Sequence, residues 1–365
     1  MSTSLEILGF GPELRAAVEA AGDPELVPAR VAIEYRDSYW VIGEDGEVMA
    51  QASGRLHHDA QSRLDLPAVG DWVLLRPGSG GAAPLVVAVL PRKSRLVRKA
   101  AGKRGAPQIV AANLDVVFIV SSLNQDFNPR RIERYRSAVI DGGAQPVLVL
   151  NKSDLGVDEA ALRAELGPVA LDTPLAIVSA KEQRGKESLA PFLAPGRTVA
   201  FVGSSGVGKS SLINWLLGAE RQTIGEIRSH DDRGKHVTTR RELIVMPGGA
   251  VLIDTPGMRE FEPWGAEEGI GQVFSDVEAI AGDCRFSDCA HESEPGCAVR
   301  EALERGELAP ERFEQYRKLL GEQRAQAARE DPLLRKRMRE EFQKKVRDMG
   351  ERHRLERGEG KGRKR

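Results

Sequence analysis

The sequence predicts a multidomain α/β protein in three parts: an N-terminal β-barrel like an OB-fold, a doubly wound α/β domain, and a helical metal-binding domain. Three observations predict this. Short alternating apolar runs separated by turn residues fill the region before residue 91. Strand-like and helix-like segments alternate after Leu114. All three cysteines then fall between Cys284 and Cys297.

Residues 1–27 are expected to form a short helical leader, and residues 28–110 the OB-like domain with a basic linker. The runs expected as strands are ARVAIEY, DSYWVIG, GEVMAQAS, DWVLLRP and LVVAVLP. The cluster Gly43 to Gly46 predicts a hairpin turn between two of them. Five short strands without an intervening helical pattern favour a barrel. Another small antiparallel domain would have the same strand count, so both interpretations stay open.

Residues 111–270 are expected to form the doubly wound sheet. The segment LDVVFIVSS is almost continuously apolar, which is typical of a parallel strand buried on both faces. The alternation continues through NPRRIERYRSAVIDGG, AQPVLVL, PLAIVSA, RTVAFVG, KSSLINWLLG, ELIVMPG and AVLIDTPG. Residues 271–330 are expected to be a helical metal-binding domain, and residues 331–365 a basic tail.

The strongest motif is the phosphate-binding pattern G-x-x-x-x-G-K-S. An apolar strand precedes it and a helix ending at Gly218 follows it. Its glycines let backbone N–H groups surround a pyrophosphate, while the helix N-terminus adds partial positive charge. Lys209 is expected to reach the β- and γ-phosphates, and Ser210 to bind Mg²⁺. The residues assigned to this cradle are Gly203, Ser204, Ser205, Gly206, Val207, Gly208, Lys209, Ser210 and Ser211.

Two further strand-end motifs predict that the base is guanine. They comprise Asn151, Lys152, Ser153 and Asp154, and then Ser179, Ala180 and Lys181. The Asp154 carboxylate can accept hydrogen bonds from N1–H and the 2-amino group of guanine, a donor pair that adenine lacks. Lys152 can cover one face of the base, and the Ala180 N–H can donate to O6. A lone N-K-x-D is more often an ordinary strand-end turn, but here it accompanies the phosphate loop.

The segment VLIDTPG supplies Asp254 to hold Mg²⁺ through water and the Gly257 N–H to contact the γ-phosphate. The order of the motifs is unusual, because N-K-S-D and S-A-K precede the phosphate loop, whereas ordinary GTPases begin with that loop. Joining old termini that lie close together on the surface would produce this order without moving any site residue. We therefore expect a circularly permuted GTPase domain.

The cysteine cluster has the spacing C-x4-C-x-H-x5-C. Its members are Cys284, Cys289, His291 and Cys297. Three thiolates and one imidazole complete a tetrahedral set, which predicts one structural zinc ion without an open position for catalysis. The alternative is a group of isolated buried cysteines. An iron–sulfur centre is disfavoured because the chain has no fourth cysteine.

Charge is unevenly distributed, although 53 Lys+Arg nearly balance 54 Asp+Glu. Residues 331–365 hold 14 basic and 7 acidic residues, and Pro91–Val110 holds seven basic residues and no acid. These segments point to a polyanionic partner such as RNA, or else to a solvated linker and tail. No apolar run is long enough for a membrane span, so no membrane partner is expected. Three cysteines exclude a disulfide scaffold and fit a cytoplasmic location.

Over residues 28–330 the combined motifs resemble the RsgA (YjeQ) family of ribosome small-subunit-dependent GTPases. The permuted motif order and the zinc spacing carry this resemblance. It implies an OB-fold, a permuted GTPase domain and a C-terminal zinc domain. It also implies GTP hydrolysis to GDP during late maturation of the small (30S) ribosomal subunit, contact with rRNA, and stimulation by the subunit. A monomer is expected.

The segment between the phosphate loop and Asp254 departs from the family pattern at Val237, where a threonine is usual. Thr238 or Thr239 is still expected to supply a second hydroxyl to Mg²⁺. Met258 stands where many GTPases have a water-orienting glutamine, so slow basal turnover is expected. His236, or a group from the ribosome, is the hypothesised replacement. The alternative for His236 is an ordinary surface histidine.

Two other functions stay open at this point. In the first, the chain is an RNA-binding assembly or translation factor in which guanine nucleotide only reports the energy state of the cell. Met258 is consistent with this alternative, because it replaces the usual water-orienting glutamine. In the second, it is an ATPase. The tail after Asp331 is expected to be a basic helix that orders on rRNA, with solvated disorder as its alternative.

Overall fold

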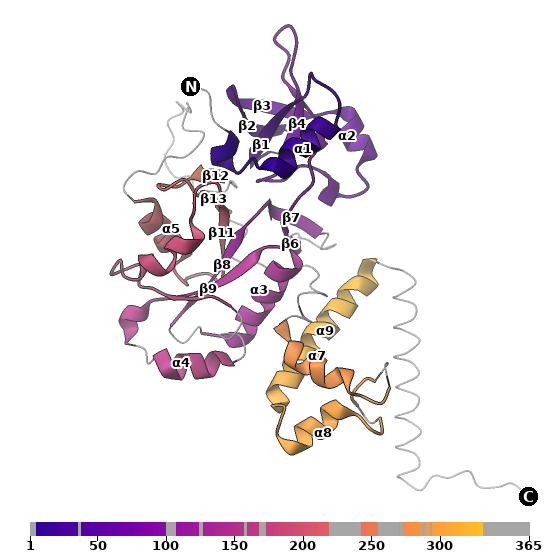
Figure 1. Ribbon diagram of the computed structural model, residues 1–365, viewed down its shortest axis with the longest axis vertical. Helices are drawn as coiled ribbons and strands as arrows, with labels where there is room; N and C mark the ends of the chain where they lie inside the picture. Colours follow the sequence, from indigo (N-terminus) through magenta and orange to yellow (C-terminus); the bar gives the residue numbers. More distant parts are fainter. Residues whose placement is uncertain are drawn as a thin grey trace, which may run out of the picture. The chain divides into compact units, whose positions relative to one another are not determined.

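The structure, a computed structural model, describes residues 5–35, 38–99, 107–123, 127–156, 159–167, 173–218, 242–254, 270, 273–286, 289–292 and 294–330. The chain divides into two compact units, Met1–Val273 and Phe274–Arg365 (Figure 1). Each unit is described by itself. Among the described residues, no helix has both the length and the apolar character that crossing a bilayer requires.

The first unit begins with a closed five-stranded barrel in the order β1-β2-β3-β5-β4. Its strands are β1 (Val27–Glu34), β2 (Ser38–Gly43), β3 (Gly46–Ala52), β4 (Trp72–Arg76) and β5 (Leu85–Val89). All pairs are antiparallel except β3 with β5, which confirms the expected OB-like barrel. A short helix, α2 (Gly54–Asp59), stands between β3 and β4 and is capped by Ser53, although the sequence predicted no helix there.

The N-terminal segment packs against the outside of the barrel. It contains η1 (Leu5–Leu8) and α1 (Pro12–Ala20). Leu8 and Phe10 join Trp72 of the barrel in one apolar cluster, which also takes in Leu243 and Val251 from the neighbouring sheet. This shared cluster joins the leader, the barrel and the edge of the sheet within one unit.

The predicted basic linker forms an additional two-stranded antiparallel sheet of β6 (Arg95–Lys99) and β7 (Pro107–Ala112). Its charged residues dominated the sequence pattern and hid the apolar positions. Leu96, Ile109 and Val110 are nevertheless buried. Part of this segment therefore belongs to the hydrophobic core, although its charged composition is typical of a solvated linker.

The central sheet of the first unit has six strands in the order β10-β9-β8-β11-β13-β12. They are β8 (Val116–Ser122), β9 (Gln145–Asn151), β10 (Leu175–Ile177), β11 (Thr198–Val202), β12 (Glu242–Val245) and β13 (Val251–Asp254). The strands are parallel except β12, which pairs antiparallel with β13. The connection from Met246 to Ala250 closes with a hydrogen bond of 2.7 Å and is too short for a parallel crossover. The doubly wound sheet expected from the sequence is therefore confirmed, with one antiparallel strand at its edge.

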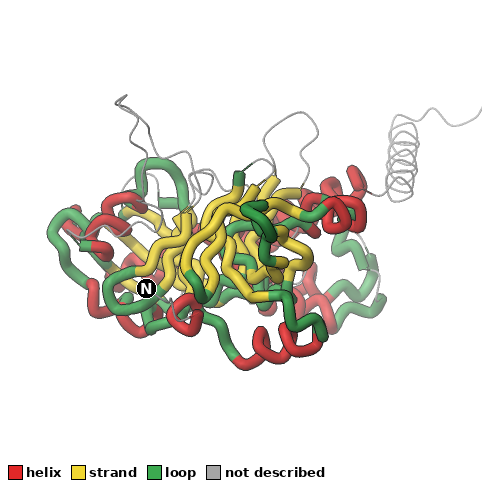
Figure 2. Tube along the Cα trace, turned by 90° about the horizontal axis from the view of Figure 1, so that it is seen from above, coloured by secondary structure: helices red, strands yellow, loops and turns green. Residues whose placement is uncertain are grey.

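Helices cover both faces of this sheet, and Figure 1 shows α3 and α5 on opposite sides of the strands. The helices are α3 (Pro129–Asp141), α4 (Glu159–Leu166) and α5 (Lys209–Leu217). Alternate strand residues enter two separate apolar cores, one with α3 and α4 and the other with α5. Figure 2 shows the strands of this unit gathered together. Short 3₁₀ helices are η2 (Arg63–Asp65), η3 (Ser153–Leu155), η5 (Lys186–Ser188) and η6 (Ala190–Phe192).

The second unit is helical in its described part. It contains α7 (Ser275–Gly282), α8 (Ala298–Arg305) and α9 (Pro310–Glu330). The guanidinium of Arg312 lies 4.1 Å from the ring centre of Phe274 and binds both carboxylate oxygens of Asp276, at 3.0 and 3.1 Å. Phe274 and Val277 are among its few fully buried apolar residues. The predicted basic tail, 331–365, lies outside the described residues.

Candidate nucleotide site and metal centre

Four sequence motifs meet at one edge of the six-stranded sheet. Asn151 ends β9, Ser179 comes shortly after β10, Gly203 follows β11, and Asp254 ends β13. These four strands run parallel to one another within the sheet, so their carboxyl ends all face the same edge. Ligands of open α/β sheets bind at this edge. The permuted chain order therefore leaves the motifs side by side.

The phosphate loop depends on glycines with positive φ angles, and at Gly203 and Gly208 a side chain would also not fit. Gly203, Gly206 and Gly208 all have positive φ angles, of 148°, 82° and 96°. A Cβ atom on Gly203 would lie 2.3 Å from the carbonyl oxygen of Val120 in β8. α5 begins directly after Gly208, and no side chain caps it. Its first N–H groups therefore remain available to an anion such as a phosphate.

Lys209 and its neighbours complete the loop. The Lys209 amine donates to the carbonyl oxygens of Gly203 and Ser204, both at 2.6 Å. Val207 is buried and anchors the loop in the core below. Ser205, Gly206, Ser210 and Ser211 are exposed. The loop thus presents polar groups outwards on a fixed apolar base.

Asn151 connects the predicted base-recognition loops to the phosphate loop. Its amide nitrogen donates to the carbonyl of Val207 at 3.0 Å, and its amide oxygen accepts the Ala180 N–H at 3.1 Å. The side chain is buried, so both bonds are shielded from water. Lys152, with a φ of 68°, reaches over to donate to the carbonyl of Gly206 at 2.9 Å. Three loops from separate parts of the chain are thereby held together.

Asp154 is fixed beside Ser179 with its carboxylate ionised. The Ser179 hydroxyl donates to one carboxylate oxygen at 2.7 Å, and the Lys181 amine lies 3.8 Å from the other. The hydrogen bond from Ser179 holds the pKa of Asp154 below its usual value, although partial burial opposes this. Ser153 lies next to it in η3. The Ala180 N–H, which the sequence assigns to guanine O6, donates to Asn151 in this structure.

We expect Gly208→Ala to weaken nucleotide binding far more than Gly206→Ala. Both glycines have positive φ, but a Cβ on Gly208 would lie 2.2 Å from the Asn151 amide nitrogen, whereas Gly206 has no neighbour within 4 Å. Displacing Asn151 breaks two buried hydrogen bonds. Their loss should cost about 2 kcal/mol of binding free energy, which is roughly a 30-fold loss of nucleotide affinity. Titration with Mg²⁺ and GDP measures this difference. Equal losses in the two variants would contradict the role given to Asn151.

One residue at this edge was missed by sequence reasoning. Arg131, in the first turn of α3, donates a hydrogen bond to the Ser204 hydroxyl of the phosphate loop. Its helix starts after the carboxyl end of β8, with Asn128 as the N-cap. The segment NPRRIERYR was interpreted only as a helix. Its position after a central strand was the available signal.

Several predicted site residues lie outside the described residues. They are His236, Val237, Thr238, Thr239, Gly257 and Met258. Asp254 is described, and it pairs with Glu242 across β13 and β12. β13 is the direct neighbour of β11, so Asp254 and the phosphate loop end adjacent strands.

The second unit brings Cys284, Cys289, His291 and Cys297 into one cluster. Their ligand atoms all lie within 4.8 Å of one another. The Cys284 sulfur is 3.9 Å from the Cys297 sulfur and 3.6 Å from Nδ1 of His291. Sulfur atoms around a tetrahedral metal with bonds of about 2.3 Å are separated by about 3.8 Å. The cluster could therefore hold one metal ion.

The electrostatics of the cluster favour the forms of Cys284 and His291 that bind metal. Burial acts to raise the pKa of the Cys284 thiol, but hydrogen bonds from the backbone N–H groups of Val299 and Ala298, at the start of α8, bring it below its usual value. Burial lowers the pKa of His291, which favours the neutral imidazole. Burial raises the pKa of Cys289 to about 11. A bound cation would reverse that effect.

Comparison with known proteins places the chain in a family. The RsgA GTPase family model matches residues 89–264. A protein from Opitutus terrae named small ribosomal subunit biogenesis GTPase RsgA is 44% identical over 362 residues, covering 97% of this chain and 99% of the relative. Its namesake from Syntrophotalea carbinolica is 42% identical over 366 residues, covering 98% and 100%.

Two solved structures have a similar fold. YjeQ from Thermotoga maritima has a TM-score of 0.58 at 28% identity and covers 82% of this chain and 98% of its own. YloQ, a circularly permuted GTPase, has a TM-score of 0.57 at 25% identity and covers 83% and 96%. The expected permutation is thereby confirmed. With this identity over nearly its whole length, and with its motifs gathered in permuted order at one sheet edge, the chain belongs to the RsgA GTPase family.

Proposed function

We propose that this GTPase binds GTP at the carboxyl edge of the central sheet and hydrolyses it while bound to the small ribosomal subunit during the late maturation of that subunit. The observation that carries the proposed site is Asn151, whose two hydrogen bonds join the base-recognition loops to the phosphate loop. The assignment to the subunit rests on relatives named small ribosomal subunit biogenesis GTPase.

The phosphate loop binds the triphosphate. Backbone N–H groups of Ser204 to Gly208 and the start of α5 surround the phosphates, and the Lys209 amine neutralises charge on the β- and γ-phosphates as it leaves the carbonyls that now accept its hydrogen bonds. Because the loop glycines fix these donors before the nucleotide arrives, little reorganisation accompanies the reaction.

The residues present fit a magnesium site. Ser210 is exposed in the first turn of α5, which follows β11, and Asp254 ends the adjacent strand β13. A hydroxyl and a carboxylate, both hard oxygen donors, therefore come from neighbouring positions at this edge. Bound Mg²⁺ would neutralise the charge that develops on the phosphates. Thr238 or Thr239 is proposed as a further ligand, Gly257 as the γ-phosphate contact, and His236 as the group that orients the attacking water.

The base is held by Asp154. Its carboxylate accepts N1–H and the 2-amino group of guanine, and the Ser179 hydroxyl keeps the carboxylate oriented for this. Lys152 already crosses to the carbonyl of Gly206, so the stem of its side chain is placed to cover one face of the base. An adenine base would offer the carboxylate neither of these two donors.

The metal of the second unit is proposed to be zinc. Three thiolates and one imidazole at tetrahedral separations match a closed structural zinc site. The proposed partner is rRNA of the small subunit, contacted through the basic residues of 91–110 and the tail 331–365, by a monomer in the cytoplasm. The five sequence regions 1–27, 28–110, 111–270, 271–330 and 331–365 are the proposed functional divisions.

We expect purified small ribosomal subunits to accelerate phosphate release from GTP by at least about 10-fold, because the chain has an apolar methionine where a water-orienting glutamine is usual. A malachite-green assay with and without subunits measures this. Large subunits at equal concentration serve as the control. Equal rates in all three conditions would instead favour a factor that only senses guanine nucleotide.

A further inference from the structure

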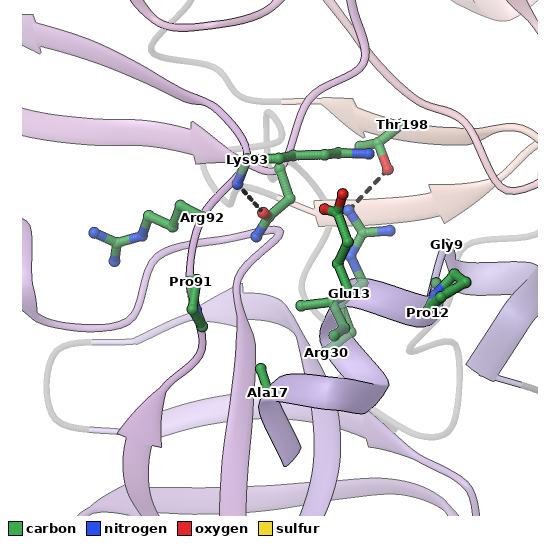
Figure 3. A pocket seen from close by; sticks show the side chains of 12 residues that line it. Gly9, Pro12, Glu13, Ala17, Arg30, Pro91, Arg92, Lys93 and Thr198 are labelled. Carbon is green, nitrogen blue, oxygen red and sulfur yellow. Dashed lines mark hydrogen bonds between the residues drawn. The ribbon is translucent and has the colours of Figure 1, made fainter. Parts of the chain in front are cut away.

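A cavity of about 410 Å³ lies in the first unit (Figure 3), where the N-terminal segment, the barrel and the sheet meet. Its polar walls come from Arg30 of β1, from Lys93 after β5, and from Asn113 and Thr198. Asn113 precedes β8, and Thr198 begins β11. The cavity is therefore at the amino edge of the sheet, opposite the phosphate loop that follows the other end of β11. Its volume is in the range of small-molecule sites.

The floor of the cavity contains a buried guanidinium. Arg30 is only 1% exposed. Its Nε donates to the carbonyl of Gly70 at 3.3 Å, one terminal nitrogen donates to the carbonyl of Leu8, and the other donates to the Thr198 hydroxyl at 2.8 Å. These bonds use three of its five N–H groups. The other two N–H groups make no hydrogen bond to the described residues, and Arg30 is one of the residues that line the cavity.

Arg30 also lacks an ion pair among the described residues. The two carboxylates that act most on its charge are already engaged: Asp71 binds Arg92 at 2.7 Å, and Asp115 binds Lys93 at 2.6 Å. The pocket region therefore holds three cations, Arg30, Arg92 and Lys93, against these two paired carboxylates and the exposed Glu13 at the rim. Burial lowers the pKa of Arg30 to about 10, so the group is still charged at neutral pH. Keeping this charge buried costs desolvation free energy. A bound anion would compensate that charge.

The rest of the lining suits a small amphiphilic anion. The start of α1 borders the cavity at Gly11 and Pro12, and no side chain caps this nine-residue helix. Leu14, Ala17 and Pro91 supply an apolar wall. Glu13 is exposed at the rim, and Figure 3 shows its side chain directed towards the same space as Arg30. Its charge would oppose the entry of an anion.

We propose that this cavity binds a small organic anion, a carboxylate or phosphate on a compact apolar body, through the two remaining N–H groups of Arg30. The ligand would contact α1, the barrel and the start of β11 together. Binding therefore stabilises the docking of the barrel and its N-terminal helix on the sheet. This site is separate from the nucleotide site, and the inference does not depend on the proposed function.

The test uses the full chain saturated with Mg²⁺ and GDP, so that added anions do not report on the phosphate loop. Phenyl phosphate and benzoate are titrated by calorimetry, with benzyl alcohol as the neutral analogue. Three variants accompany the wild type. Ala17→Leu fills the cavity, Glu13→Gln removes the rim charge, and Glu19→Gln is a charge-matched control on the same helix that does not line the cavity.

We expect one or both anions to bind and to raise the melting temperature, while benzyl alcohol does neither. Glu13→Gln should tighten binding by about 3- to 10-fold, since a like charge is removed, and Glu19→Gln should not. Ala17→Leu should weaken it at least about 10-fold without lowering the melting temperature of the free chain. Binding of phenyl phosphate alone assigns a phosphate ligand, and binding of benzoate alone a carboxylate. Equal binding by wild type and Ala17→Leu, or by benzyl alcohol, would overturn the proposal.

Discussion

An Asp154→Asn variant is expected to lose at least about 100-fold of its affinity for GDP and to gain affinity for XDP, the xanthine analogue. The carboxylate accepts two donors from guanine, whereas the asparagine amide offers one acceptor and its own donors. Xanthine has a carbonyl at C2, which accepts from that amide. Ser179 fixes the carboxylate at 2.7 Å. Ser179→Ala should therefore weaken GDP binding by a smaller amount, about 5- to 10-fold, without a gain for XDP.

Competition titration with GDP, XDP and ADP in the presence of Mg²⁺ measures this exchange. Asp45→Asn, an exposed turn residue of the barrel, is the matched control and should bind GDP as the wild type does. An Asp154→Asn protein that still prefers GDP over XDP would remove Asp154 from base recognition. Tight ADP binding by the wild type would identify an ATPase.

Removal of the metal is expected to unfold the second unit while the first unit keeps its nucleotide affinity within about twofold. The described part of this unit buries few large apolar side chains: Phe274, Val277, Val299, Leu308, Phe313 and Tyr316. Structural zinc contributes about 10–16 kcal/mol in small zinc domains, more than such a core supplies. The Cys297 sulfur also caps α8 by accepting the Arg300 N–H at 3.5 Å. Loss of the ion therefore loosens both the cluster and the helix that follows it.

The metal is removed either by the Cys289→Ser substitution or by treatment with a chelator. Glu307→Gln, a substitution of an exposed residue in the same unit, is the control. Elemental analysis should find one zinc ion per wild-type chain. Proteolysis after chelation should cut within 274–330 and spare the first unit. Every thiol that a thiol reagent detects belongs to this cluster, since the chain has no other cysteine. Protease resistance unchanged by complete removal of zinc would contradict a structural metal.

The parts of the fold that could be predicted are those in which local pattern and tertiary role agree. The strands ending at Asn151, Val202 and Asp254 are apolar runs followed at once by turn residues, so the residue pattern by itself places their motifs at one edge of a sheet. The metal cluster could likewise be predicted from the cysteine spacing, because its four ligands are close in sequence. Permuted order did not obscure the site, since strand ends rather than chain order determine where loops meet.

What could not be predicted depends on contacts between distant segments. The pair β6 and β7 was hidden by its charged residues, and the antiparallel direction of β12 follows from a turn that the apolar pattern does not encode. The Arg30 site joins Leu8, Gly70 and Thr198, which are up to 168 positions away. In sequence Arg30 is merely one charge in a barrel strand. Only the docking of the barrel on the sheet buries it.

The most direct test of the guanine site is a crystal structure of the full chain with Mg²⁺ and a non-hydrolysable GTP analogue. The structure should place the Asp154 carboxylate within about 3 Å of N1 and the 2-amino group, and the Lys209 amine at the β- and γ-phosphates. One nucleotide would then span loops that Asn151 already joins. A nucleotide whose phosphates occupy the loop while its base points away from Asp154, or one bound elsewhere, would contradict the assignment.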